Sequence, residues 1–524
     1  MKELRELKFE ELTLEQKLGL TMTMNLHGPW RTEEENEFVY NLIRRRALGC
    51  VWVQQGYDNT LDVIKKIREI ADYPILIMTD AENGIDKYVV GKHNAIGTTG
   101  SAKHAYAFGK TVGVTARKMG YTVVCDPVVD MGDGSMRSLG VDKEKVAELS
   151  MAIGKGMHEG GVLTVAKHYP GGTPSIKVDA HMAESLSDCT KEELLDNHLY
   201  PYIKLWEAGL LDGIMTKHCR FVNIDNDYPA SLSKKVIDIF RETGYEGFAI
   251  TDALCMMGIR AKFDDVEAKG LAINAGNDLL LPYVRENEDM FNQYKEAYEK
   301  GLINDEALDA AVKRVLAAQH KTLLLPTEGD LTEEEIATFN SINKDGVYVH
   351  KDEGLSDSIS KDGKHFFIVC IKQEAVLKDG KVDVDTFSSG WNKPERILKK
   401  IEELFPNSKQ LFIHEYPSQN EMMRALSDSL GCDRLVVMTF TEALAYTGPE
   451  YLTHRVVNLI SSMQKTNRIS TLIHFGNPHV LEELPHIPRV IFGGLAADSV
   501  DATLEVLAGD YPANGVPTYE FNLQ

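Results

Sequence analysis

Lys167 and His168 end the apolar run Val162–Ala166, and a loop rich in glycine and proline follows them. That loop carries a second histidine, His181, with Asp179 two residues before it. A histidine titrates near neutrality, so it can protonate a leaving oxygen and later take a proton from water. An aspartate bonded to one ring nitrogen fixes the tautomer and raises the basicity of the ring. Asp179 and His181 are therefore a candidate acid/base dyad, although a solvated loop histidine beside a loop aspartate would have the same spacing.

Asp252 is the candidate nucleophile. It follows the apolar run Phe248–Ile250 and Thr251, and a largely apolar segment continues after it. A carboxylate held in this way can attack the anomeric carbon of a sugar and form a glycosyl-enzyme, as in retaining glycoside hydrolysis. An aspartate at a strand–helix junction can also be a helix N-cap, so the residue by itself leaves both interpretations open.

Charged or titratable side chains also follow other predicted strands. One such residue is commonly a cap or a solvated loop residue, whereas five strands that end in this way predict a shared polar pocket. Lys167 and His168 would suit hydrogen bonds to sugar hydroxyls; the structural alternatives are a core histidine and a lysine paired with a barrel carboxylate. The residues that follow predicted strands are Asp80, Asp126 with Asp130, Lys167 with His168, Lys217 with His218, and Asp252.

Short apolar runs alternate with longer helix-like segments over the N-terminal part of the chain. Strand–helix alternation indicates parallel βα units. Eight such units in about 300 residues predict the α/β class with a (β/α)8, TIM-like barrel, whose catalytic groups lie at the carboxyl ends of the strands. The eight candidate strands are Leu18–Met22, Cys50–Val53, Ile75–Met78, Val123–Cys125, Leu163–Ala166, Gly213–Met215, Phe248–Ile250 and Leu279–Leu281.

The pattern changes near Leu325. Polar residues dominate 326–362, apart from a short helix predicted over Leu331–Ile342, and this stretch is interpreted as a linker. Apolar runs then return at spacings that allow helices between them, which predicts a C-terminal α/β sandwich domain. The predicted division is a catalytic barrel at 1–325, a linker at 326–362 and a sandwich domain at 363–524. The runs of the second domain are Phe366–Ile371, Leu411–Ile413, Leu435–Phe440, Thr471–Phe475 and Val490–Phe492.

Composition limits the partners. The formal net charge of −22 disfavours nucleic acid and anionic membrane surfaces, both of which attract Lys and Arg. The N-terminal residues show no apolar segment of a secretory signal, and no apolar run is long enough to span a membrane. Seven scattered cysteines without a CxxC motif fit a reduced, cytoplasmic protein with no structural zinc site.

Several motifs in order carry a resemblance. The sequence resembles the β-N-acetylhexosaminidase branch of glycoside hydrolase family 3, which has Lys-His-Phe-Pro-Gly-His-Gly and then Asp-Ser-His in a catalytic loop. This chain reads Lys167–Gly172 and then Asp179–His181. Further family motifs are Ser-Asp-Asp-Leu-Ser-Met, Asp-Gln-Glu-Gly-Gly, Pro-Val-x-Asp, Arg-Ser-Phe-Gly and Met-Thr-Ala-His. They look like Thr251–Met256, Asp80–Gly84, Pro127–Asp130, Arg137–Gly140 and Met215–His218 in this chain.

The resemblance implies roles for these residues. Asp252 would be the nucleophile, and His181 would be the acid/base with Asp179 as its partner. Other branches of the family take a glutamate from the second domain as acid/base, so here that domain need not supply catalysis. The residues implied to bind the sugar in the −1 subsite are Asp80, Arg137, Lys167 and His168, and His218 is assigned to the same substrate-binding set.

The chain also departs from the family pattern. Gly172-Thr173 replaces His-Gly, and the loop from Lys167 to Asp179 is one residue longer. Ile85 replaces an arginine, Asp126 replaces a small apolar residue, and Ala253 replaces a second aspartate. These positions surround the expected pocket, so the reaction class is better supported than the sugar specificity.

The expected function is that of a retaining exo-β-N-acetylglucosaminidase, without metal or cofactor, acting on small glycosides or cell-wall fragments. One alternative is a phosphorylase, because a neutral histidine does not repel phosphate and Lys167 and Arg137 could help an anion approach. A second is a β-glucosidase, given the altered Asp80–Ile85 segment. A third, from a different class, is a sugar-binding protein that has lost catalysis. A homodimer is compatible with the sequence.

Overall fold

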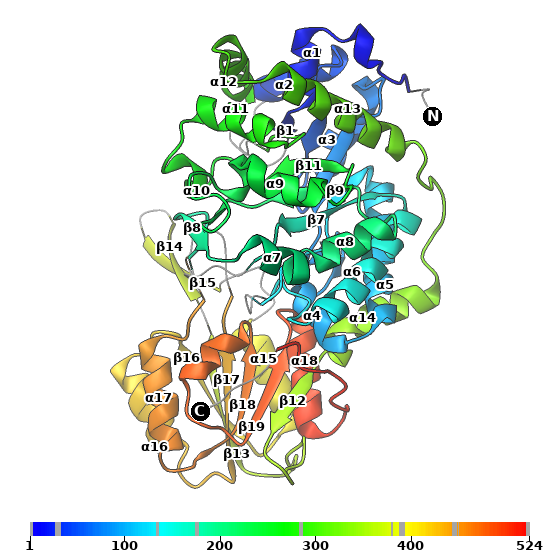
Figure 1. Ribbon diagram of the computed structural model, residues 1–524. Coiled ribbons are helices and arrows are strands. Elements are labelled where there is room, and N and C mark those ends of the chain that lie inside the picture. The colour runs from blue at the N-terminus through cyan, green and yellow to red at the C-terminus, as the bar shows by residue number, and fades with distance from the viewer. Residues whose placement is uncertain are drawn as a thin grey trace.

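The chain forms two α/β units, a barrel and a sheet sandwich, which lie one above the other in this computed structural model (Figure 1). The structure describes residues 4–26, 33–132, 136–172, 178–281, 287–371, 373–378, 381–386, 393–442, 448 and 450–519.

The first unit is a parallel barrel. Seven strands follow one another in the order β1-β2-β3-β6-β7-β9-β11. Leu279–Leu281 takes the eighth place, because it bridges Ile250 of β11 on one side and Met22, just before β1, on the other. The predicted α/β class, a barrel followed by a second sheet domain, is confirmed. The barrel strands are β1 Thr23–Asn25, β2 Cys50–Trp52, β3 Leu76–Asp80, β6 Val123–Cys125, β7 Leu163–Tyr169, β9 Gly213–Thr216 and β11 Phe248–Thr251.

Alternate strand residues point into the barrel and out toward the helices, as the pleat of a strand requires. Trp52, Met78 and Ile250 belong to the cluster inside the barrel, whereas Val51 and Ile77 pack against the surrounding helices. The helices of this unit are α1 Leu14–Leu20, α2 Glu33–Arg44, α3 Thr60–Ile70, α4 Lys92–Thr99, α5 Ala102–Met119, α6 Lys143–Gly160, α7 Lys191–Glu193, α8 Tyr200–Glu207, α9 Lys234–Arg241, α10 Met257–Arg260, α11 Asp265–Ala275, α12 Asn287–Glu299 and α13 Asp305–Thr322.

The predicted first strand, Leu18–Met22, is wrong in its position. Leu18 to Leu20 are the last turn of α1, and the strand begins only at Thr23. A short apolar run does not distinguish the buried end of a helix from a buried strand. The signal for the helix was the capping box of Thr13 and Gln16, whose side chains each bond the other's backbone N–H.

The second unit has a six-stranded sheet in the order β12-β19-β18-β17-β13-β16, with β12 antiparallel and the others parallel. Along β13, Phe366 and Ile368 face one apolar cluster and Phe367 and Val369 face another. Helices therefore cover both faces of the sheet. Its elements are β12 Tyr348–Lys351, β13 His365–Ile371, α15 Pro394–Leu404, β16 Lys409–His414, α16 Gln419–Asp428, β17 Arg434–Phe440, α17 His454–Gln464, β18 Ile469–Phe475, β19 Arg489–Gly493 and α18 Ala497–Ala508.

The stretch 326–362, interpreted as a linker, contains two ordered elements. Helix α14 (Glu333–Asp345) packs beside α5 and α18, and so contacts both units. Strand β12 pairs with β19. A polar stretch with a short strand resembles a linker in sequence, because an edge strand buries only one side of its backbone.

Short strand pairs lie outside the two large sheets. The pairs are β4 Gly84–Ile85 with β5 Tyr88–Val89, β8 Ser185–Ser187 with β10 Cys219–Phe221, and β14 Gln373–Lys378 with β15 Lys381–Thr386.

In the described part of the chain, no helix is long and apolar enough to cross a membrane.

Asp278 tests what holds the last barrel strand in place. Its buried carboxylate accepts from Arg241 (3.0 Å), Arg314 (2.7 Å) and the Ala249 N–H of β11 (2.7 Å). Asp278→Ala leaves two arginines without their carboxylate, and we expect a loss of about 3 kcal/mol in the free energy of unfolding. Urea unfolding followed by tryptophan fluorescence measures it. Asp238→Ala, which breaks a solvent-exposed pair with Lys234, should cost less than about 1 kcal/mol; equal losses would contradict the assignment.

Candidate active site

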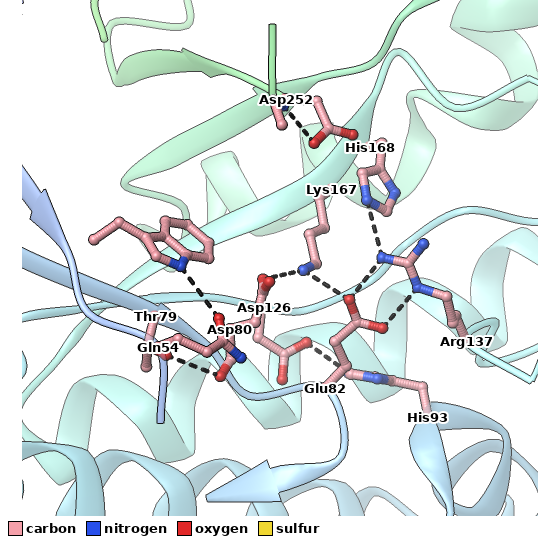
Figure 2. A network of polar contacts seen from close by, with 12 residues as sticks. Gln54, Thr79, Asp80, Glu82, His93, Asp126, Arg137, Lys167, His168 and Asp252 are labelled. Atoms are coloured by element: carbon pink, nitrogen blue, oxygen red, sulfur yellow. Dashed lines mark hydrogen bonds and ion pairs between the residues drawn. The ribbon is translucent and has the colours of Figure 1, made fainter. Parts of the chain in front are cut away.

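The carboxyl ends of β3, β7, β9 and β11 bring most of the predicted polar residues together, as Figure 2 shows for Asp80, Lys167, His168 and Asp252. Parallel strands of one barrel end at the same face, so residues far apart in the sequence meet there. The predicted side chains therefore meet at one end of the barrel, where Asp80, Lys167 and His168 belong to one set of polar contacts.

Asp252 follows β11 directly and is partly buried. Its own N–H donates to the Thr216 carbonyl at the end of β9 (2.9 Å), and its Oδ1 accepts from the Ala253 N–H (2.7 Å). Burial would raise the pKa of the Asp252 carboxyl. His168, His218 and the Ala253 N–H outweigh burial and hold that pKa below its usual value. The carboxylate is thus fixed in orientation and kept ionised, which a nucleophile requires.

Asp179 and His181 form the predicted pair. Nδ1 of His181 lies 2.7 Å from Oδ1 of Asp179, and the same oxygen accepts from the His181 N–H at 2.9 Å. Burial would raise the pKa of Asp179, but its bonds with the N–H and ring of His181 and with the Gly448 N–H lower it below the usual value. An ionised Asp179 holds the proton on Nδ1, so Nε2 faces away from it and can exchange a proton.

Backbone hydrogen bonds join the two halves of the site. The segment after Asp252 runs into α10, and its Met257 N–H donates to the His181 carbonyl (3.2 Å). The Gly258 N–H donates to the Ala180 carbonyl (3.1 Å). Helix α10 therefore holds the loop that carries His181 to the segment that carries Asp252.

Lys167 is the centre of a buried ion cluster. Its ammonium is paired with Asp80 and lies 2.8 Å from Oε1 of Glu82. Arg137 donates two hydrogen bonds to the same Glu82, at 2.7 and 2.6 Å. The structure thus supports the ion-pair interpretation of Lys167, and Asp80 and Arg137 belong to the same cluster. Glu82 was not among the predicted site residues, although it lies in the Asp80–Gly84 motif.

The cluster sets the charges of its members. Burial would lower the pKa of Lys167, but Asp80 and Glu82 raise it above its usual value. Burial likewise would raise the pKa of Glu82, and Arg137 and Lys167 lower it well below the usual range. The pKa of Asp80 is raised, because burial and the neighbouring Glu82 outweigh the attraction of Lys167.

His168 connects this cluster to the strand β6 side of the barrel. Its Nδ1 lies 2.6 Å from Oδ2 of Asp130, and Arg137 donates to its Nε2 (3.1 Å). Lys217 lies 3.3 Å from the other oxygen of Asp130. A register irregularity follows Lys167 in the pairing of β7 with β9, and such bulges re-aim side chains. Both Lys167 and His168 can therefore serve the pocket, although they are neighbours on one strand.

His218 takes a different place from the predicted sugar contact. It is buried, its Nε2 donates to the Ala253 carbonyl (3.0 Å), and its Nδ1 lies 2.7 Å from the Ser231 hydroxyl. Burial lowers the pKa of His218. Because both ring nitrogens bond protein groups, this geometry assigns His218 to positioning the Asp252–Ala253 backbone.

Three departures from the family pattern have a local explanation. Gly172 has φ +79°, and a Cβ there would lie 2.7 Å from the Phe221 ring, so a histidine would not fit. Asp126 is fully buried, 2.6 Å from Nε2 of the equally buried His93, as Figure 2 shows. Ile85 is buried in the apolar cluster that lies between the barrel strands and the surrounding helices. The longer part of the loop, 173–177, lies outside the described residues.

Comparisons with known proteins show the family of this chain. The family model described as "Glycosyl hydrolase family 3 N terminal domain" matches residues 14–318. A beta-hexosaminidase of Haemophilus influenzae is 30% identical over 280 residues, which are 50% of this chain and 78% of that protein. The chain therefore belongs to glycoside hydrolase family 3 and is a glycoside hydrolase.

Two solved structures share the whole fold. A family 3 beta-N-acetylglucosaminidase from Paenibacillus sp. has a TM-score of 0.80 at 22% identity, covering 98% of this chain and 100% of that one. The beta-glucoside phosphorylase BglX has a TM-score of 0.81 at 19% identity, covering 98% and 95%. In the described residues, no group of three or more His, Cys, Asp or Glu is placed to hold a metal ion.

Glu82→Gln tests the residue that the sequence motifs did not single out as functional. The amide keeps the shape but loses the charge that Arg137 and Lys167 compensate, and charge-assisted hydrogen bonds are worth about 1.5–3 kcal/mol. We expect kcat/KM to fall about 10- to 100-fold on a substrate the enzyme turns over. Glu69→Gln, at an exposed position on α3, should leave kcat/KM unchanged. A similar rate in both variants would mean that the cluster does not shape the pocket.

The pKa values of Asp80 and Asp252 are shifted in opposite directions, and this predicts which of the two carboxyls sets the acid limb of the pH–activity profile. The pKa of Asp80 is raised and that of Asp252 is lowered. As the pH falls, Asp80 therefore gains a proton first and Asp252 last. Asp80→Asn should move the acid limb of kcat/KM to lower pH, besides lowering its plateau. Asp86→Asn, at an exposed position, should leave the acid limb of kcat/KM in place. An acid limb that also stays in place in Asp80→Asn would contradict its assignment to Asp80.

Proposed function

We propose that the protein is a retaining exo-β-N-acetylglucosaminidase that hydrolyses terminal β-linked GlcNAc from small glycosides, such as cell-wall fragments. The observation that carries this is the joining of an ionised Asp252 to the Asp179–His181 pair through α10. The names of the Haemophilus influenzae and Paenibacillus proteins support the sugar.

In the first step, a carboxylate oxygen of Asp252 attacks C1 of the sugar while His181 Nε2 protonates the glycosidic oxygen. The C1–O bond breaks, the alcohol leaves, and a glycosyl ester of Asp252 forms. In the second step, His181 takes a proton from water, whose oxygen attacks C1 and releases Asp252. Asp179 stabilises the protonated ring before the first proton transfer and after the second, and it holds the tautomer of the neutral ring between them.

The sugar would be held by the ion cluster. Asp80 and Arg137 remain partly exposed, with 36% and 39% of their side chains accessible, whereas Lys167 is 2% accessible. Asp80 and Arg137 can therefore bond hydroxyls directly, while Lys167 mainly fixes Asp80. His168, 12% accessible and bonded at both nitrogens, orients Arg137.

The charges of the site favour water over phosphate as acceptor. Among the described residues of the site, each cation that could attract phosphate has a carboxylate partner: Lys167 has two, Arg137 has Glu82, and Lys217 has Asp130. With Asp252 and Asp179 also ionised, the described residues of the mouth carry no excess positive charge for a phosphate dianion. Hydrolysis is therefore proposed ahead of phosphorolysis.

Asp252→Ala tests the reaction directly. We expect kcat on p-nitrophenyl β-N-acetylglucosaminide to fall at least about 10⁴-fold, with azide restoring turnover as the α-glycosyl azide. Product analysis of the unaltered enzyme with and without millimolar phosphate should give GlcNAc in both cases, and p-nitrophenyl β-glucoside should be a poorer substrate. Asp265→Ala, at the first residue of α11 and outside the proposed site, is the control. Turnover that survives in Asp252→Ala, or a sugar 1-phosphate as product, would refute the proposal.

A further inference from the structure

The acid/base pair also contacts the second unit. Oδ2 of Asp179 accepts from the Gly448 N–H at 3.4 Å, 269 positions along the chain. Gly448 follows β17, in the second unit. Oδ1 of the same carboxylate is bonded to the N–H and ring of His181. Asp179 therefore lies between the barrel loop and the second unit, and 11% of its side chain is accessible against 32% for His181.

A carboxylate bonded at both oxygens has a fixed plane. The bond at Oδ1 directs the His181 ring, and the bond at Oδ2 opposes rotation of the carboxylate about its Cβ–Cγ bond. Burial would raise the pKa of Asp179, and the Gly448 N–H, together with His181, lowers it. A change in the position of Gly448 would therefore alter the orientation of the Asp179 carboxylate and, through it, that of the His181 ring.

The second unit holds the segment around Gly448 at both ends. Before it, the Thr441 N–H donates to the Phe475 carbonyl of β18 (2.8 Å). After it, the Thr453 hydroxyl donates to the Glu415 carbonyl, and Arg455 donates to the Pro417 carbonyl (2.9 Å). Gly448 itself has φ +81°, with open space where a Cβ would be. The backbone conformation, not the lack of room, is what favours glycine here.

We propose that Gly448 is a positioning residue for the acid/base pair, so that the second unit takes part in catalysis by orienting Asp179 and, through it, His181. This rests on the dyad of the proposed function. It differs from supplying an acid/base side chain, since the group offered is a backbone N–H. Separation of the two units would withdraw this bond and leave the nucleophile Asp252 untouched.

Gly448→Pro removes the N–H, and Gly448→Asn is the matched control. Asparagine tolerates a positive φ and keeps the N–H. We expect Gly448→Pro to lower kcat/KM about tenfold for an alkyl β-N-acetylglucosaminide, whose leaving group needs protonation. The leaving group of the p-nitrophenyl glycoside needs little protonation, so Gly448→Pro should change kcat/KM for that substrate less than twofold. Gly448→Asn should resemble the unaltered enzyme on both. An equal loss on both substrates would overturn the proposal, because a general structural defect does not depend on the leaving group.

A double-mutant cycle tests the route through Asp179. In an Asp179→Ala background, Gly448→Pro should have no further effect on the alkyl glycoside, and a persisting tenfold loss would overturn the proposal. Thermal unfolding and GlcNAc binding check that the variants fold. If Gly448→Pro does not fold, Gly448→Val replaces it, since a β-branched residue disfavours this φ and displaces the N–H.

The two proposals fail separately. If His181→Ala kept full turnover of the alkyl glycoside, the dyad itself would be wrong. If His181→Ala lost that turnover but the cycle were additive, only the role of Gly448 would be wrong.

Discussion

The burial of the Lys167 ammonium is the constraint on which the mouth of the barrel depends. A buried ammonium is costly unless opposite charges surround it, and Asp80 and Glu82 meet that requirement from the end of β3 and the turn after it. Glu82 in turn bonds Arg137, which reaches His168, and His168 bonds Asp130. Each charged group in this series is compensated or oriented by the next one. The result is a preorganised polar wall, which suits the proposed bonding of sugar hydroxyls.

The groups that orient Asp252 differ from those of the ion cluster. It lies apart from this chain of ion pairs, and backbone groups at the ends of β9 and β11 orient it. Its pKa is lowered while that of Asp80 is raised. Two carboxyls in one pocket thus have environments that push their pKa values apart, as is common where carboxyls have different roles. Asp252 is kept as an anion, as the proposed nucleophilic attack requires, and Asp80 is tied to a cation.

Contacts from several elements join the barrel to the second unit. Helix α14 packs against elements of both units, and β12 follows it into the second sheet. The contact of Gly448 with Asp179 extends this joining to the loop that carries the proposed acid/base pair. A loop that carries an acid/base residue has to be held during reaction yet admit substrate. Backbone bonds from α10 on one side and from the second unit on the other can satisfy both needs.

By itself, the sequence determined the barrel, the second sheet domain and most of the residues at the mouth. Six of the eight predicted strands lie where they were expected, and Leu279–Leu281 forms bridges at the eighth place, because buried parallel strands are short apolar runs that end in polar residues. The Asp179–His181 bond was also predictable, since two residues in one loop are near each other in any fold. Only the tertiary structure decided the rest. Glu82 became a central residue because β3 and β7 place it beside Lys167, His218 turned inward to the Ala253 backbone, and Gly448 met Asp179 from the other unit. Contacts between residues distant in sequence depend on how the elements pack, and a local pattern of residue types does not record that packing.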